Sequence, residues 1–279
     1  MRLKGNNINI PVNTITINYN DQGPDDAPVI IFIHGFPFNK SMWDGQRAEL
    51  KENTRVIAYD IRGHGKSEEG NEDFSIDLFV NDLIGLMDAL KLDKVTLCGL
   101  SMGGYIALGA ITKYPERFDS LVLSDTNCIA DTAEGKEKRM NAIKNIKENG
   151  VEKYTDEMIK NLFATESFST RQSVITRVKE MMNKTSQTSL CKTLLALAER
   201  KETCSKLEAI KVPVLIIVGK EDKITPPAAA RAMHEKIKDS RLCILNHAGH
   251  VANMENPEEF TEQLKMLLYQ SKTRTAIFY

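Results

Sequence analysis

A serine between two closely spaced glycines is the clearest candidate for chemistry in this sequence. Ser101 stands in the segment Gly-Leu-Ser-Met-Gly at positions 99–103, after an apolar run typical of a strand and before a pattern typical of a helix. A serine on such a tight turn projects its Oγ above a sheet, and Gly99 and Gly103 leave room for neighbouring backbone. The helix that begins at Met102 directs its N–H groups and positive dipole end at the serine. The pattern therefore predicts that Ser101 is a nucleophile.

A serine nucleophile needs a base that accepts its proton, and histidine is the usual one. Three histidines follow Ser101 in the chain. His234 falls inside a helical pattern and is interpreted as structural. His250 follows Gly249 in a loop after a predicted strand, where glycine allows close backbone approach. His250 is therefore the predicted base, and His247 is its rival.

The base needs a carboxylate that fixes its tautomer and stabilises its charged form. Asp222 follows a predicted strand in the segment Gly-Lys-Glu-Asp-Lys at positions 219–223. Loops at the carboxyl ends of parallel strands are where ligand-facing groups gather. Asp125 follows the preceding strand and should lie on the same edge of the sheet, so it is the competitor, whereas Glu221 is a weaker neighbour. We predict Asp222 as the acid and leave Asp125 open.

Two backbone N–H groups should stabilise the oxyanion that forms when a serine attacks a carbonyl. The first is the N–H of Met102, the residue after the nucleophile. The second is assigned to Phe36, because Gly35 lets the loop after an early strand turn sharply and Pro37 has no N–H. His34 is interpreted as a residue that orients this loop, not as a second base.

These candidates need a scaffold that brings distant loops to one edge. Continuous Val/Ile/Leu runs alternate with helical patterns, which is typical of parallel strands buried on both faces. The sequence predicts an α/β fold, with a mostly parallel central sheet flanked by helices, and an antiparallel opening hairpin formed by residues 8–10 and 15–19. The predicted strands are residues 15–19, 29–33, 55–59, 94–98, 120–124, 214–218 and 241–245, and the predicted helices are residues 75–90, 102–114, 227–237 and 257–269.

The alternation of strands and helices is interrupted between residues 127 and 211. This stretch has no convincing strand and four helical patterns, at residues 140–146, 151–163, 174–182 and 190–197. It predicts an all-helical insertion at 127–211, between a first core part at 1–126 and a second at 212–279. Residues 271–279 lose their periodicity and are expected to form a frayed end.

Five segments in this order resemble the α/β-hydrolase superfamily across nearly the whole chain: residues 34–37, 60–67, 99–104, 219–222 and 249–250. The resemblance implies that the insertion is a helical cap over a partly apolar pocket, and that residues 60–67, with His64, form a structural loop. Within the superfamily, the chain length, the cap and the segment Ala-Gly-His-Val-Ala-Asn-Met-Glu-Asn-Pro are most similar to the 3-oxoadipate enol-lactonase and small carboxylesterase group.

The residues and the resemblance together predict a serine hydrolase that cleaves a small-molecule carboxylic ester or lactone through an acyl-enzyme. No metal and no organic cofactor is expected. A serine nucleophile argues against relatives that use aspartate, such as haloalkane dehalogenases and epoxide hydrolases. C–C bond hydrolysis, cofactor-free perhydrolysis and a non-enzymatic small-molecule receptor stay open as alternatives.

Net charge, apolar runs and cysteine spacing indicate which partners and which cellular location to expect. The formal net charge of the 279 residues is −1, and no block of Lys and Arg stands out, so nucleic acid and anionic membranes are not expected as partners. No secretory signal or membrane-spanning run is recognised, which predicts a cytoplasmic protein. The five cysteines are odd in number and lack close metal-ligand spacing, so reduced thiols are expected. The sequence makes no prediction about the oligomeric state.

Overall fold

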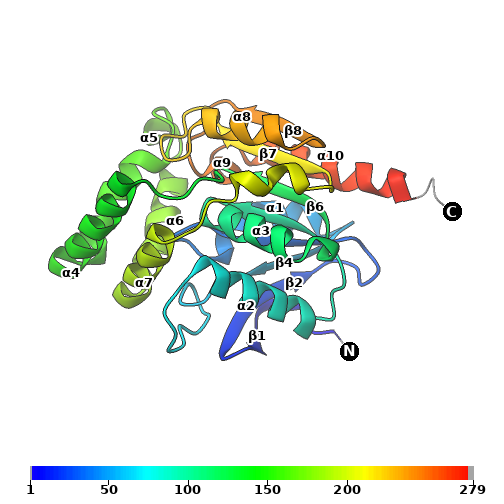
Figure 1. Cartoon of the computed structure of the whole chain (residues 1–279), viewed down its shortest axis with the longest axis horizontal. Coiled ribbons are helices and arrows are strands. Elements are labelled where there is room, and N and C mark those ends of the chain that lie inside the picture. The colour runs from blue at the N-terminus through cyan, green and yellow to red at the C-terminus, as the bar shows by residue number, and fades with distance from the viewer. Residues whose placement is uncertain (1, 276–279) are drawn as a thin grey trace.

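An eight-stranded sheet forms the centre of the protein (Figure 1). The computed structural model describes residues 2–275. The strands lie in the order β1-β2-β4-β3-β5-β6-β7-β8; the β1–β2 and β2–β4 pairs are antiparallel and all later pairs are parallel. The strands are β1 Gly5–Val12, β2 Ile15–Gln22, β3 Val29–Ile33, β4 Arg55–Tyr59, β5 Val95–Leu100, β6 Phe118–Ser124, β7 Val214–Gly219 and β8 Ser240–Leu245.

Helices connect these strands and cover both faces of the sheet. The α-helices are α1 Asp44–Leu50, α2 Ile76–Ala89, α3 Met102–Lys113, α4 Ala133–Leu162, α5 Ser167–Thr170, α6 Gln172–Asn183, α7 Gln187–Ala198, α8 Pro227–Lys236, α9 Ala252–Glu255 and α10 Pro257–Thr275. Within residues 2–275 there are also three short 3₁₀ helices: η1 Lys40–Trp43, η2 Pro115–Arg117 and η3 Cys204–Ala209.

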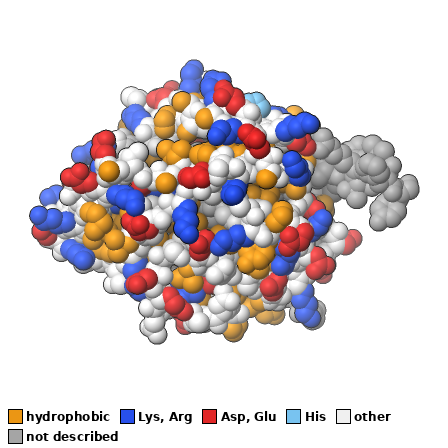
Figure 2. Space-filling view, in the orientation of Figure 1, with side chains coloured by type: hydrophobic (Ala, Val, Ile, Leu, Met, Phe, Trp, Pro, Cys, Tyr) orange, Lys and Arg blue, Asp and Glu red, His pale blue; other side chains and the backbone are white. Residues whose placement is uncertain are grey.

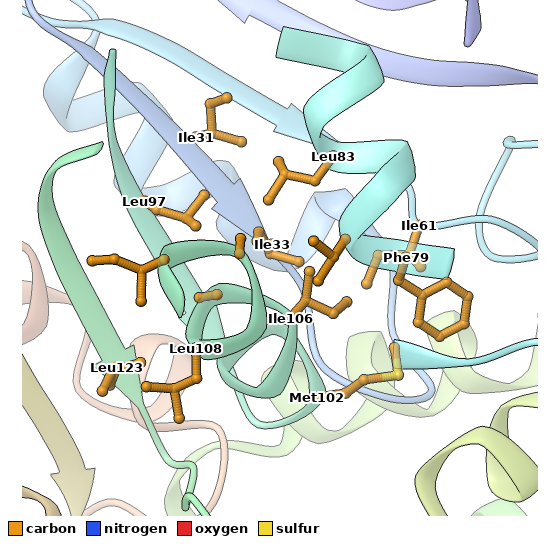
Figure 3. Close-up of a cluster of buried hydrophobic side chains, with 14 of the residues drawn as sticks. Ile31, Ile33, Ile61, Phe79, Leu83, Leu97, Met102, Ile106, Leu108 and Leu123 are labelled. Atoms are coloured by element: carbon orange, nitrogen blue, oxygen red, sulfur yellow. The ribbon is translucent and has the colours of Figure 1, made fainter. Parts of the chain in front are cut away.

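Successive residues of a central strand belong to two different hydrophobic clusters, one on each face of the sheet. Ile33 of β3 lies in the cluster that contains Leu83 of α2 and Ile106 of α3 (Figure 3). Its neighbour Phe32 lies in the cluster that contains residues of α1 and α10. Because side chains alternate along a strand, a strand buried on both faces must be apolar at every position, which explains the continuous Val/Ile/Leu runs.

Most predicted elements are present. All seven predicted strands occur with ends that differ by at most three residues, and the antiparallel opening pair is β1–β2. The helices α1 and α9 were not predicted, because seven and four residues are too few to display a helical period. The prediction of a frayed end is wrong up to Thr275, where α10 ends, and for residues 276–279 it lies outside the described residues.

The chain between β6 and β7 is helical. Residues 127–211, all of which the structure describes, contain α4, α5, α6, α7 and η3 and no strand. Gly150 interrupts α4 with a φ of 84°, so two of the predicted helical patterns meet there. In Figure 1, α4, α6 and α7 project together to one side of the sheet. We call α4–α7 the inserted helices.

The expectation of reduced thiols is wrong for two of the five cysteines. Cys128, just after β6, and Cys204, at the start of η3, form a disulfide. The N–H of Thr203 also donates to the carbonyl of Cys128 at 2.8 Å, so the two ends of the insertion meet at this point. The partners are 76 residues apart, and sequence spacing indicates only local cysteine patterns. The cysteines therefore no longer support the prediction of a cytoplasmic location.

Charged side chains of both signs are interspersed over the face of the molecule drawn in Figure 2, with apolar side chains exposed between them. Such mixing is usual for a protein surface whose formal charges nearly balance. Among the described helices, none is sufficiently long and apolar to cross a bilayer.

Candidate active site

Ser101 lies on a strained turn between β5 and α3. Its φ is 53° and its ψ is −114°, a backbone conformation that non-glycine residues seldom adopt. A Cβ on Gly99 would lie 2.2 Å from the carbonyl oxygen of Gly103, and a Cβ on Gly103 would lie 2.4 Å from the carbonyl oxygen of Ile33. Both glycines are therefore required by the close backbone approach that the sequence predicted.

The structure brings His250 to Ser101. The Nε2 atom of His250 lies 2.9 Å from the Oγ of Ser101, although 149 residues separate the two in the chain. The imidazole is almost fully buried. Ser101 stands at the N-cap of α3, but its hydroxyl forms no capping bond, so its Oγ is available to the imidazole.

Asp222 completes a chain of hydrogen bonds. Its Oδ2 lies 2.8 Å from the Nδ1 of His250. The carboxylate is held in place by the N–H groups of Ile224 at 2.8 Å and Thr225 at 2.9 Å, and by the hydroxyl of Thr225 at 2.7 Å. These donors fix the carboxylate in the loop after β7. With Nδ1 bound to this acceptor, the neutral imidazole carries its proton on Nδ1 and presents a free lone pair at Nε2.

Burial and charge shift the two titrating groups in opposite directions. Burial alone would lower the pKa of His250, yet the carboxylate of Asp222 outweighs it and raises that pKa, with further contributions from Asp125 and Glu255. Burial alone would raise the pKa of Asp222, but His250 and the bonds from Thr225 lower it. The site therefore favours an ionised Asp222 and stabilises a protonated imidazole.

Asp125, the alternative acid, lies at the same edge of the sheet but is bound elsewhere. Its Oδ1 accepts the N–H of Gly219 at 2.8 Å and its Oδ2 accepts the hydroxyl of Ser124 at 2.7 Å. Burial, followed by repulsion from Asp222, raises the pKa of Asp125 well above its ordinary value. The hydrogen bonds of Asp125 join the ends of β6 and β7.

The loop after β3 packs directly over the nucleophile turn. A Cβ on Gly35 would lie 2.9 Å from a side-chain carbon of Leu100 and 3.3 Å from the Cβ of Ser101. Gly35, the residue directly before Phe36, therefore lies against the turn of the serine. The N–H of Met102 opens α3 and so has no acceptor within the helix. The assignment of the two oxyanion donors to Phe36 and Met102 stays a prediction.

The remaining histidines are engaged in other contacts. His34 is buried; its Nε2 accepts the N–H of Ile61 at 3.0 Å, and its Nδ1 lies 2.8 Å from the carbonyl of Gly35. Burial lowers the pKa of His34 well below its ordinary value, so the ring is a neutral brace for this loop. His247 is exposed and pairs with Glu166 at 2.7 Å.

His234, His64 and Glu221, the remaining side chains considered in the sequence, make contacts of their own. The Nδ1 of His234 contacts the hydroxyl of Ser240 at 2.8 Å. His64, which was expected to be structural, is buried and its Nδ1 contacts the carbonyl of Arg62 at 3.0 Å. Glu221 accepts the N–H of Thr165 at 3.0 Å.

Glu255 is a residue of this site that the sequence did not single out. Its buried carboxylate accepts the N–H of Gly249 at 2.6 Å, the N–H of Ala164 at 2.8 Å and the hydroxyl of Ser167 at 2.6 Å. It therefore joins the loop that carries His250 to the segment between α4 and α5. A carboxylate between Met254 and Asn256 gives no local signal of such contacts in the sequence.

Within residues 2–275, no group of three or more His, Cys, Asp or Glu side chains is arranged to hold a metal ion.

Comparison with known proteins places this site in a family. The family model described as alpha/beta hydrolase fold matches residues 28–257. The chain belongs to the α/β-hydrolase fold family. Among characterised relatives, 3-oxoadipate enol-lactonase 2 of Acinetobacter baylyi is 28% identical over 254 residues, which cover 91% of this chain and 93% of that protein.

Solved structures of similar proteins have the same fold. A thermophilic esterase from Thermogutta terrifontis superposes with a TM-score of 0.91 at 32% identity, and the match covers 95% of this chain and 99% of that one. The enol-lactonase from Burkholderia xenovorans gives a TM-score of 0.88 at 26% identity, with 94% and 100% covered. These findings confirm the predicted fold and the predicted resemblance to enol-lactonases and small esterases.

Proposed function

We propose that this protein is a serine hydrolase that cleaves carboxylic esters or lactones of small molecules. The observation that carries the proposal is the hydrogen-bonded chain from Ser101 through His250 to Asp222. The order nucleophile, base, acid is the arrangement that activates a serine hydroxyl for acyl transfer. The names of the similar enol-lactonases and esterase support an ester or lactone as the substrate.

In the first half of the proposed reaction, His250 takes the proton of Ser101 while Oγ forms a bond to the carbonyl carbon. Asp222 stabilises the imidazolium. The N–H groups of Phe36 and Met102 stabilise the oxyanion; removal of one such donor costs about 3 kcal/mol of transition-state stabilisation in comparable sites. The carbon–oxygen bond to the leaving group then breaks, and His250 returns the proton to the leaving alkoxide.

In the second half, His250 takes a proton from water, which attacks the acyl group on Ser101. The tetrahedral intermediate collapses, the carboxylic acid leaves and Oγ regains its proton. For a lactone, the alcohol and the acid formed in the two halves are parts of one product. No step requires a metal or an organic cofactor.

We further propose that residues 127–211 form a cap on a core made of residues 1–126 and 212–279. The absence of strands from residues 127–211, all of which the structure describes, supports this division, and two hydrogen bonds join the two parts. The N–H of His250 donates to the carbonyl of Leu162, at the end of α4, at 2.7 Å. On the other side, the hydroxyl of Ser189 in α7 donates to Glu69 at 3.0 Å. The inserted helices thus contact the loop that carries the proposed base.

The replacement Ser101→Ala tests the proposal. Wild-type protein should hydrolyse short-chain p-nitrophenyl esters and react covalently with a fluorophosphonate probe, and Ser101→Ala should lose both activities while it keeps its far-UV circular dichroism. A panel of esters, lactones and thioesters of graded length would then rank the substrates. Full esterase activity in Ser101→Ala would refute the assignment, and labelling without turnover of any panel member would favour a receptor.

A further inference from the structure

A polar cavity of about 570 Å³ lies among residues that the proposed reaction does not use. Its wall is built from β1, β2, the segment around η1 and α1, the loop after β4, and Lys184 at the end of α6. None of Ser101, His250, Asp222 and Phe36 lines it. The volume lies within the range of about 300–1,000 Å³ that is usual for small-molecule sites.

Two amide side chains of this wall, those of Asn6 and Gln22, have their oxygens occupied by Arg47. Arg47 donates from Nη2 to the Oδ1 of Asn6 at 2.6 Å and to the Oε1 of Gln22 at 3.0 Å. A guanidinium group only donates, so this contact fixes which end of each amide faces Arg47. The amide NH₂ groups of Asn6 and Gln22 have no acceptor in the described part of the chain.

The side-chain amide oxygens of Asn20 and Asn39 are likewise occupied by hydrogen-bond donors. The Oδ1 of Asn20 accepts the N–H of Asn7 at 2.7 Å, and the Oδ1 of Asn39 accepts the N–H of Ser41 at 3.0 Å. Backbone N–H groups only donate, so these orientations are also fixed. Asn20 and Asn39 therefore keep their NH₂ groups as donors that no described residue accepts.

The two carboxylates of the wall are already neutralised. Asp60 accepts the Nζ of Lys40 at 2.6 Å and the backbone N–H groups of Lys40 at 2.8 Å and Lys66 at 2.9 Å. Asp44 pairs with Arg47, and with Arg177 at 2.7 Å. Both carboxylates of the wall are thus already paired with cations.

Three ammonium groups of the wall have no carboxylate partner. Lys51, Lys66 and Lys184 form no ion pair with any described residue. Arg47 is buried, and its Nε–H has no acceptor within residues 2–275. The wall therefore combines an excess of positive charge with a row of hydrogen-bond donors.

We propose that this cavity binds a small molecule that carries at least two anionic oxygen-bearing groups, carboxylates or phosphates. Such groups only accept hydrogen bonds, so they match a lining whose carboxylates are already paired and which carries free amide and ammonium donors. Charge-assisted bonds from Lys66 and Lys184 would hold the ligand between the core and the inserted helices. The binding does not depend on the reaction at Ser101.

Isothermal titration calorimetry on the full chain tests this inference, with citrate as the carboxylate probe and inorganic pyrophosphate as the phosphate probe. The ionic strength is kept constant with sodium chloride, because exposed lysines are screened by salt. We expect saturable binding of at least one probe with one site per chain, and the stronger probe identifies the anion class. The double variant Lys66→Gln/Lys184→Gln should raise the dissociation constant of this probe about tenfold or more, because two partly screened positive charges are lost.

The matched control is Lys94→Gln/Lys238→Gln, which removes the same charge from exposed positions outside the cavity and should leave the affinity unchanged. Covalent labelling of Ser101 with a fluorophosphonate should also leave it unchanged. The inference is overturned if neither probe binds saturably up to about 10 mM, if both double variants weaken binding equally, or if labelling of Ser101 abolishes it.

Discussion

The carboxylate of Glu255 accepts the backbone N–H of Gly249 at 2.6 Å, and Gly249 is the residue directly before His250. The same carboxylate binds Ala164 and Ser167 on the segment that follows α4. One buried side chain therefore fixes the loop of the proposed base to the inserted helices. We interpret Glu255 as a positioning residue that acts through the backbone of this loop.

The substitution Glu255→Gln should lower kcat more than it changes KM. In either orientation of the glutamine amide, its NH₂ would face a backbone N–H, that of Gly249 or that of Ala164. Two donors would then oppose each other, and the loop of His250 would shift. The unsatisfied buried donors should also lower the free energy of unfolding by about 1–3 kcal/mol. Because Glu255 raises the pKa of His250, the acid limb of kcat/KM should move to lower pH.

Steady-state kinetics as a function of pH and urea denaturation measure these effects. The control is Glu258→Gln, the same chemical change on an exposed residue of α10, which should behave as the wild type. An unchanged acid limb together with a normal kcat would contradict a positioning role.

The pH dependence of activity should follow the ionisation of His250. The imidazole must be neutral to accept a proton, and Asp222 raises its pKa, so kcat/KM should fall as the pH drops through a value above about 6.5, the ordinary pKa of histidine. Asp222→Asn should move this limb to lower pH and reduce kcat by about 10³–10⁴-fold, because the imidazole loses the acceptor that fixes its tautomer.

Asp125→Asn separates the two candidate acids. An amide at position 125 keeps an oxygen for the N–H of Gly219, and the hydroxyl of Ser124 can accept from its NH₂. Its kcat should stay within about tenfold of the wild type, because Asp125 does not hydrogen-bond His250 and both of its own hydrogen bonds can be retained by the amide. A larger loss of kcat in Asp125→Asn than in Asp222→Asn would transfer the role of the acid to Asp125.

The turn around Ser101 should tolerate no side chain at Gly99. A Cβ there would lie 2.2 Å from the carbonyl oxygen of Gly103, which is backbone and cannot rotate away. We expect Gly99→Ala to destabilise the fold by at least about 1–3 kcal/mol and to abolish activity. Gly45→Ala is the matched control, because a Cβ at Gly45 in α1 meets nothing within 4 Å and alanine favours a helix. Equal stability of both variants in urea would disprove the steric argument.

The disulfide between Cys128 and Cys204 should stabilise the junction of the insertion with the sheet. Replacement of both cysteines by alanine should lower the free energy of unfolding by about 2–4 kcal/mol, because the link closes a long segment of the unfolded chain. The denatured protein should show three free thiols without reductant, from Cys98, Cys191 and Cys243, and five after reduction. Cys191→Ala serves as the control, and five thiols without reductant would contradict the pairing.

The sequence by itself determined the features that depend on local patterns. Val29–Ile33 and Arg55–Tyr59 are recognisable as buried strands because both faces of the sheet are covered. The turn around Ser101 is recognisable because its glycines are required by contacts within a few residues and with the adjacent strand. These local patterns correctly predicted the mostly parallel sheet, its flanking helices and the helical character of residues 127–211.

Tertiary structure decided what distant segments do to one another. Asp125 and Asp222 follow neighbouring strands and look alike in the sequence, yet only the loop after β7 brings a carboxylate to His250. The disulfide of Cys128 joins residues that 76 positions separate. Glu255 owes its contacts to a segment about 90 residues away in the chain. Hydrogen bonds and ion pairs form between groups that lie a few ångströms apart in space, whereas the sequence gives only the order of these groups along the chain.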